Sequence, residues 1–99
     1  MEQDIKQLKA MAESCRVLYV EDEKELAGQM IEFLKKFFKE VTYAQNGSDG
    51  LKKYGEGDFD LVITDILMPE LDGLEMGRRI RELDSEQDII FMSANMEIK

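Results

Sequence analysis

Short apolar runs alternate with amphipathic stretches along most of the chain. Runs at residues 17–20 (VLYV), 59–63 (FDLVI) and 89–92 (IIFM) suit strands that are buried on both faces, and residues 41–44 (VTYA) form a shorter one. Between these runs, apolar residues recur with helical spacing in three segments. These are about residues 24–38, a segment that starts after the turn at 46–48 and ends at about 54, and residues 73–83. This order, β-α-β-α-β-α-β, predicts an α/β domain with a parallel sheet and helices on both faces.

Two of the expected helices have an apolar stripe that should face the sheet. For the helix at about 24–38 the predicted stripe is Leu26, Met30, Phe33, Leu34 and Phe37. For the helix at 73–83 it is Leu74, Met76, Gly77, Ile80 and Leu83. Either Asp22 or Glu23 could cap the first of these helices, because acidic side chains suit a helix N-terminus.

Residues 1–14 are polar but periodic, and they predict an additional amphipathic helix before a domain at 15–99. Ile5, Leu8, Met11 or Ala12, and Cys15 fall on one helical face. One interpretation is an extension that packs on the domain or frays. The other is a helix that forms an interface with a partner.

Composition narrows the possible functions. The 99 residues suit one domain, and the net charge of −9 argues against nucleic acid or an anionic membrane as a direct partner. Cys15 is the only cysteine, so no intrachain disulfide can form, which fits a reducing cytoplasm. The chain has no histidine, signal peptide or membrane-spanning apolar run, so histidine-based catalysis and membrane insertion are not expected.

Polar side chains follow three of the expected strands at the point where each strand ends. Glu21 and Asp22 follow the run at 17–20, Asp65 follows the central run, and Ser93-Ala94 follows the last. The carboxyl ends of parallel strands meet at one edge of a sheet, so these residues should converge there. Converging carboxylates suit Mg²⁺, which prefers oxygen ligands.

These motifs together resemble the receiver domain of response regulators in two-component signalling. The matching residues are VLYV with Glu21-Asp22, then ITD ending at Asp65 with Met68-Pro69 and Asp72-Gly73, and finally FMS with Ser93-Ala94. The similarity extends over residues 16–99, and the ordered combination is far more specific than any one motif. It implies a flavodoxin-like, doubly wound sheet, here with strand order 2-1-3-4.

The resemblance also implies a role for each residue of the site. Asp65 would accept a phosphoryl group from a sensor histidine kinase, with Mg²⁺ held by Asp22, Asp65 and the backbone carbonyl of Leu67. Glu21, where the family more often has aspartate, would bind the ion directly or through water. Ser93 would donate a hydrogen bond to the phosphoryl group and signal its presence, and the small Ala94 would leave room for it. The chain would therefore be a signalling module rather than an enzyme.

The resemblance stops before the family pattern is complete. A receiver continues with a fourth helix, a fifth strand that ends in a lysine, and a closing helix, whereas Lys99 lies too soon after the last strand to match that lysine. We therefore expect a receiver that is truncated at its C-terminus, has no active-site lysine and is poorly phosphorylated. Its fourth-strand edge and uncovered sheet face should favour a homodimer.

Two other functions deserve comparison. A haloacid-dehalogenase-like phosphatase also uses an aspartate at a strand end, but it needs a second aspartate where this chain has Leu67, so we discount it. The stronger alternative is a module that dimerises or binds partners without phosphorylation.

Overall fold

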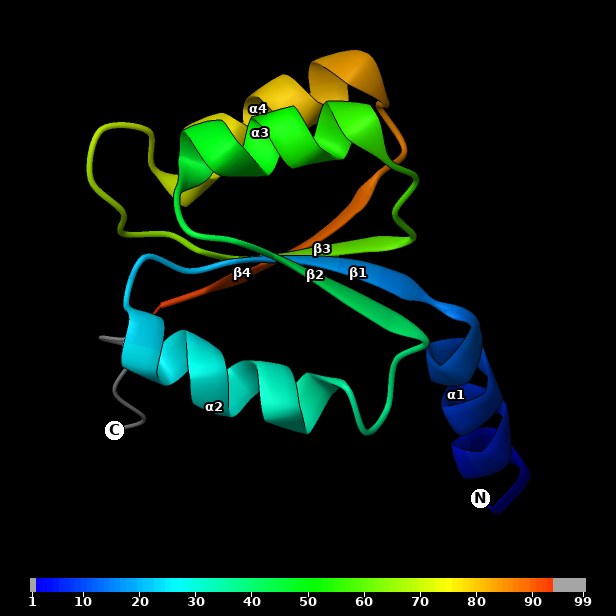
Figure 1. Ribbon diagram of the computed structural model, residues 1–99. Coiled ribbons are helices and arrows are strands. Elements are labelled where there is room, and N and C mark those ends of the chain that lie inside the picture. Colours follow the sequence, from blue (N-terminus) through cyan, green and yellow to red (C-terminus); the bar gives the residue numbers. More distant parts are fainter. Residues whose placement is uncertain (1, 94–99) are drawn as a thin grey trace, which may run out of the picture.

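Four parallel strands form one sheet between layers of helices in the computed structural model, which describes residues 2–93 (Figure 1). In chain order the elements are α1 Glu2–Ser14, β1 Arg16–Val20, α2 Lys24–Leu34, β2 Glu40–Ala44, α3 Gly47–Glu56, β3 Leu61–Asp65, α4 Gly73–Leu83 and β4 Asp88–Met92. The strand order is β2-β1-β3-β4, which confirms the predicted order 2-1-3-4. In the described residues no helix is both long and apolar enough to span a membrane.

The sheet separates two apolar cores, because successive strand residues point to opposite faces. α3 and α4 cover one face and α2 lies on the other (Figure 1). The core beneath α3 and α4 contains Leu18, Val20, Ala44, Val62, Met68, Met76 and Ile80. The core beneath α2 contains Val17, Tyr19, Ala27, Leu34 and Ile63. β1 and β3 supply residues to both cores, which explains their nearly continuous apolar sequences.

Helix α2 is shorter than the sequence predicts, and its predicted stripe is correct only in part: Leu34 is buried and Met30 packs against the core. It ends at Leu34 rather than near residue 38, because the N–H of Lys36 and that of Phe37 bond to carbonyls three residues earlier. Phe33 is 53% exposed and Phe37 is 40% exposed, so neither belongs to the buried stripe. Their rings instead contact each other, with centroids 5.0 Å apart. Ala27, which the predicted stripe omitted, is buried.

The predicted stripe of α4 is correct only in its middle. Met76, Gly77 and Ile80 are buried, but Leu74 is 54% exposed and Leu83 is 70% exposed. Leu74 precedes Met76 by two residues, which places it about 200° around the helix from the buried face. Leu83 is the last helical residue, where the chain turns toward β4.

Helix α1 is present where residues 1–14 predict one. It projects from the amino end of β1, away from the sheet (Figure 1). Met11 is 63% exposed, while Ala12 and Cys15 are half-buried. The proposed division into this helix and a domain at 15–99, and the choice between an extension and an interface helix, stay predictions.

Candidate functional site

Three carboxylates gather at the carboxyl ends of β1 and β3. One carboxylate oxygen from each of Glu21, Asp22 and Asp65 lies within 4.8 Å of the others. Glu21 follows β1 directly, and Asp65 is the last residue of β3. The parallel arrangement of β1 and β3 therefore brings together residues that are 44 positions apart in the chain.

Backbone hydrogen bonds hold both strand ends in the sheet. The N–H of Glu21 donates to the carbonyl of Ala44 at 3.1 Å, and the N–H of Ile66 donates to the carbonyl of Met92 at 2.8 Å. These bonds continue the β1–β2 and β3–β4 ladders by one residue past the strands. The two carboxylates are thus anchored by rigid backbone rather than by mobile loops.

The loop after β3 is folded tightly against Asp65. The N–H of Gly73 donates to the carbonyl of Ile66 at 2.9 Å. A Cβ atom at Gly73 would lie 2.0 Å from the backbone oxygen of Asp65, so only glycine fits there. Asp72 then caps α4 by accepting a hydrogen bond from the N–H of Glu75 at 2.8 Å. The Asp72-Gly73 pair therefore serves packing and capping beside the acidic site.

The acidic residues differ in exposure and environment. Glu21 is 2% exposed and Asp65 is 6% exposed, whereas Asp22 is exposed. Burial raises the pKa of Glu21, although the N–H of Glu23 offsets part of this by donating to its Oε2 at 3.0 Å. Glu23 is the N-cap residue of α2, but its side chain makes no capping bond, so the predicted cap is right in position only. Among the described residues, no lysine or arginine forms an ion pair with Glu21, Asp22 or Asp65.

A cavity of about 180 Å³ opens beside these acids on the α2 side of the sheet. The residues that line it are Tyr19, Glu21, Leu26, Met30, Asp65, Met92 and Ser93. Ser93 is therefore close to Asp65, as the sequence predicts, while Ala94 lies outside the described residues. The side chain of Leu67 is 60% exposed, and a metal-binding role for its backbone carbonyl stays a prediction.

Two tyrosines border the acids, and the sequence analysis did not identify either as a site residue. Tyr43 of β2 donates its hydroxyl to the backbone carbonyl of Glu21 at 2.6 Å. Tyr19 is fully buried, its ring centroid is 6.2 Å from that of Tyr43, and burial raises its pKa, with the nearby Glu21 adding to the effect. The available signal was strand alternation, because Tyr19 precedes Glu21 by two residues and so faces the same side.

The donor set fits a hard divalent cation. All three acids offer carboxylate oxygen atoms, and one oxygen of each lies within 4.8 Å of the others. Carboxylates held this close repel one another, and a cation would relieve that repulsion. Mg²⁺ commonly binds through one or two carboxylates and keeps several waters, which suits a partly open group of this kind.

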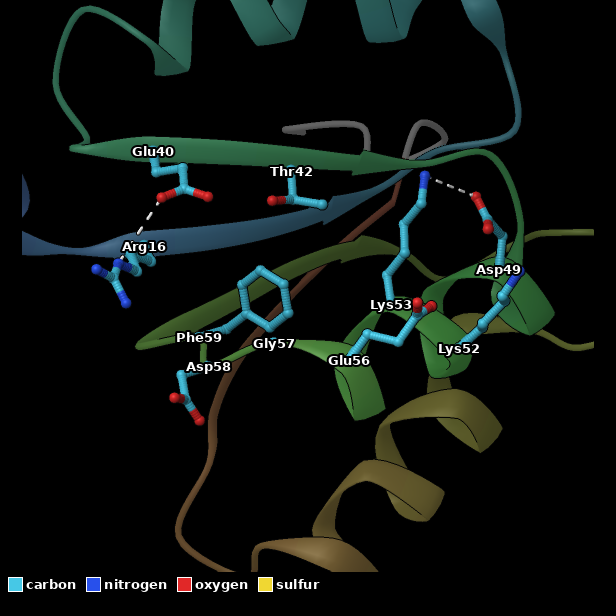
Figure 2. Close-up of a pocket in the computed structure, with 10 residues that line it drawn as sticks. All are labelled: Arg16, Glu40, Thr42, Asp49, Lys52, Lys53, Glu56, Gly57, Asp58 and Phe59. Carbon is cyan, nitrogen blue, oxygen red and sulfur yellow. Dashed lines mark ion pairs between the residues drawn. The ribbon is translucent and has the colours of Figure 1, made fainter.

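A larger hollow of about 500 Å³ lies elsewhere, mainly between α3 and the amino-terminal halves of β1 and β2 (Figure 2). Its charged residues largely neutralise one another: Arg16 pairs with Glu40 at 3.7 Å, and Lys53 pairs with Asp49 at 3.1 Å. Figure 2 shows the ring of Phe59 among these polar groups. The hollow includes none of the residues predicted to act in chemistry, so the acidic cluster is the candidate site.

Known proteins resemble this chain over most of its length. Residues 17–99 match the family described as the response regulator receiver domain. The chain is 36% identical over 78 residues to the response regulator receiver protein CpdR of Brucella abortus, a match that covers 79% of this chain and 65% of that protein. The chain thus spans just under two-thirds of the length of this relative.

Solved structures show the same similarity. The response regulator TrrA from Thermotoga maritima, in a complex with Mg²⁺–BeF, matches with a TM-score of 0.76 and 39% identity, over 80% of this chain and 69% of that one. A second structure contains the histidine kinase ThkA in complex with TrrA. It matches with a TM-score of 0.77 and 37% identity, over 85% and 72% of the respective chains.

Proposed function

The chain belongs to the response regulator receiver domain family, and from this premise we propose that Asp65 accepts a phosphoryl group from a sensor histidine kinase, with Mg²⁺ bound beside it. The observation that carries the proposal is the approach of the Glu21, Asp22 and Asp65 carboxylates to within 4.8 Å. The two TrrA structures, one with Mg²⁺–BeF and one with a histidine kinase, support the same chemistry by analogy.

In this proposal the three acids bind the metal ion together. Glu21, Asp22 and Asp65 hold the ion, and the carbonyl of Leu67 is a further candidate ligand. When bound, Mg²⁺ neutralises charge on the phosphoryl oxygens. Asp22 is the exposed member, so it lies where an ion would enter. Ser93, in the same cavity as Asp65, is suitably placed to donate a hydrogen bond to a phosphoryl oxygen.

The proposed transfer is a simple displacement at phosphorus. An oxygen of Asp65 forms the new O–P bond while the N–P bond of the phosphohistidine breaks. The electron pair of that bond stays on the imidazole nitrogen, which then takes a proton from solvent. Positioning and charge neutralisation account for most catalysis of this reaction. Rigid anchoring of Asp65 between β3 and the Gly73 turn provides the positioning.

Incubation with acetyl phosphate and MgCl₂, followed by intact-mass measurement, tests the proposal without a known kinase. We expect one added phosphoryl group, dependence on Mg²⁺, and loss of the product in Asp65→Asn. Asp58→Asn is the matched control, because Asp58 is an exposed acid in the turn between α3 and β3 and should leave phosphorylation unchanged. An unmodified wild-type chain, or equal modification of Asp65→Asn, would contradict the proposal.

Self-association is a second candidate function, and the surface of β4 favours it. Within residues 2–93, β4 pairs only with β3, and Ile90 of β4 is 48% exposed. A strand with an open edge and an apolar face is a template for a second copy. This association would not require phosphorylation.

Light scattering at high micromolar concentration tests this second candidate. We expect a dimer that is weakened by Ile90→Lys, whereas Leu83→Lys, at an exposed apolar residue of α4, should leave it intact. A monomeric wild-type chain, or equal effects of the two substitutions, would exclude association through β4.

A further inference from the structure

Two buried polar atoms beside the acidic cluster have no hydrogen-bond partner in the described structure. They are the hydroxyl oxygen of Tyr19 and Oδ1 of Asp65. Tyr19 is 0% exposed and Asp65 is 6% exposed, so bulk water does not satisfy either atom. Buried polar groups are nearly always hydrogen-bonded because leaving one unpaired is costly. No direct hydrogen bond joins them, because neither has a partner within bonding distance; one can donate and the other can accept, so a single water between them would satisfy both.

The strand register brings the two side chains to the same place. Tyr19 of β1 is paired with Ile63 of β3, and both belong to the core beneath α2. Asp65 lies two residues beyond Ile63, so its side chain points to that same face of the sheet. Tyr19 and Asp65 are therefore diagonal neighbours on adjacent strands, a separation that a long aromatic side chain and one water can bridge. Both residues also line the cavity of about 180 Å³.

The neighbouring tyrosine is not available for the same task. The hydroxyl of Tyr43 already donates to the backbone carbonyl of Glu21 at 2.6 Å. The hydroxyl of Tyr19 has no such partner, and Tyr19 lines the same cavity as Glu21 and Asp65. Of these two, Asp65 carries the unpartnered buried oxygen, whereas Glu21 accepts the N–H of Glu23 through Oε2.

We propose that Tyr19 is a positioning residue for Asp65: its hydroxyl donates a hydrogen bond that reaches Oδ1 through one water in the cavity. This bond fixes the rotation of the carboxylate about its last side-chain torsion. The other oxygen of Asp65 is then presented to the metal and to the incoming phosphoryl group. The hydrogen bond itself does not depend on phosphorylation, but its role in positioning rests on the function proposed above.

A double-mutant cycle in urea unfolding tests the bond without any phosphoryl chemistry. Tyr19→Phe should lower the unfolding midpoint in the wild-type background and have no such effect when Asp65→Leu has removed the acceptor. The hydroxyl of Tyr54 on α3 donates to Oε1 of Gln87 at 2.7 Å. Tyr54→Phe is therefore the matched control, and it should lower the midpoint equally in both backgrounds. A raised midpoint in Tyr19→Phe, or equal changes in both backgrounds, would overturn the proposal.

Proton NMR of the full chain keeps the test decisive if Asp65→Leu does not fold. The buried hydroxyl proton of Tyr19 should give a slowly exchanging resonance, assigned by its loss in Tyr19→Phe. This resonance should shift in Asp65→Asn, where a neutral oxygen replaces the charged acceptor. A hydroxyl proton that exchanges rapidly, or a resonance that Asp65→Asn leaves in place, would count against the bond.

Phosphorylation by acetyl phosphate at saturating Mg²⁺ then separates a positioning role from a structural one. Tyr19→Phe should slow the reaction about tenfold, and Tyr54→Phe should leave the rate unchanged. A coupled pair in the unfolding cycle together with an unchanged rate would make Tyr19 a structural residue and overturn the positioning role. If wild-type protein takes up no phosphoryl group while the coupling persists, it is the proposed function that fails.

Discussion

Carboxylates occur in two contrasting settings in this molecule, at the end of the sheet and along α4. At the end of the sheet, burial raises the pKa of Glu21, and no lysine or arginine in the described part of the chain forms an ion pair with it. On α4, Glu75 lies 2.7 Å from Arg78 and 3.3 Å from Arg79, and the hydrogen bonds from Arg78 lower its pKa to about 2. Arg78 also pairs with Glu82 one turn further along the helix.

The difference shows which acids remain available for function. The carboxylates of α4 are neutralised by their own helix, since residues three and four apart face each other. Glu21 and Asp22 follow β1, Asp65 ends β3, and the three meet without such a partner. An external cation should therefore bind much more favourably at the sheet edge than on α4. Each prediction below tests this contrast.

The largest expected effect comes from the turn that holds Asp65. Gly73→Ala should lower the free energy of unfolding by about 3 kcal/mol, because the new Cβ would collide with the backbone oxygen of Asp65. Urea denaturation measures the loss. Gly28→Ala on α2 is the matched control: it has open space, and it should stabilise the helix by about 0.5–1 kcal/mol. Equal effects of the two substitutions would refute the tight turn.

Mg²⁺ should produce the next largest effect. Binding to the folded chain alone should add about 2.7 kcal/mol of stability at a free concentration of 100 times Kd. Thermal unfolding with and without MgCl₂ measures this gain, which Asp22→Asn should abolish and Glu82→Gln, on α4, should preserve. The contrast between the two regions is lost if Mg²⁺ leaves the melting temperature unchanged or if both substitutions act alike.

Charge removal in magnesium-free buffer should have opposite signs in the two regions. Glu21→Gln should stabilise the chain by about 1 kcal/mol, because it removes a buried charge that faces Asp22 and Asp65. Glu75→Gln should slightly destabilise it, because two arginines lose their partner. Denaturation midpoints measured side by side in EDTA compare the signs, and two changes in the same direction would contradict this account.

The smallest effect is a pH dependence that arises on α4. The pKa of Glu75 is about 2 in the folded chain and 4.5 without its arginines, so its contribution is complete above pH 4.5 and is lost as pH falls toward 2. The stability difference between wild type and Glu75→Gln should therefore shrink over that interval. The pair is exposed, so the difference should be small and weaker still in high salt. A difference that stays constant with pH would argue against this pair.

Helix surfaces show where prediction from periodicity fails. The pattern correctly selected Met76 and Ile80 of α4, but it also selected Leu74 and Leu83, which are exposed. It likewise extended α2 beyond Leu34 and placed Phe33 and Phe37 in the core. Periodicity identifies an apolar direction around a helix, whereas the depth of each residue depends on how much sheet lies opposite it.

The sequence by itself predicted the approach of Glu21, Asp22 and Asp65, because parallel strands joined by helices end at a common edge, and its resemblance to the receiver family predicted the strand order. Only the tertiary structure revealed that Tyr19 and Asp65 carry complementary buried atoms beside one cavity. That relation depends on the pairing of Tyr19 with Ile63 across two strands. A slip of one residue would turn every side chain of a strand to the other face, so the register is decided when the apolar residues of both strands are buried together in the assembled sheet.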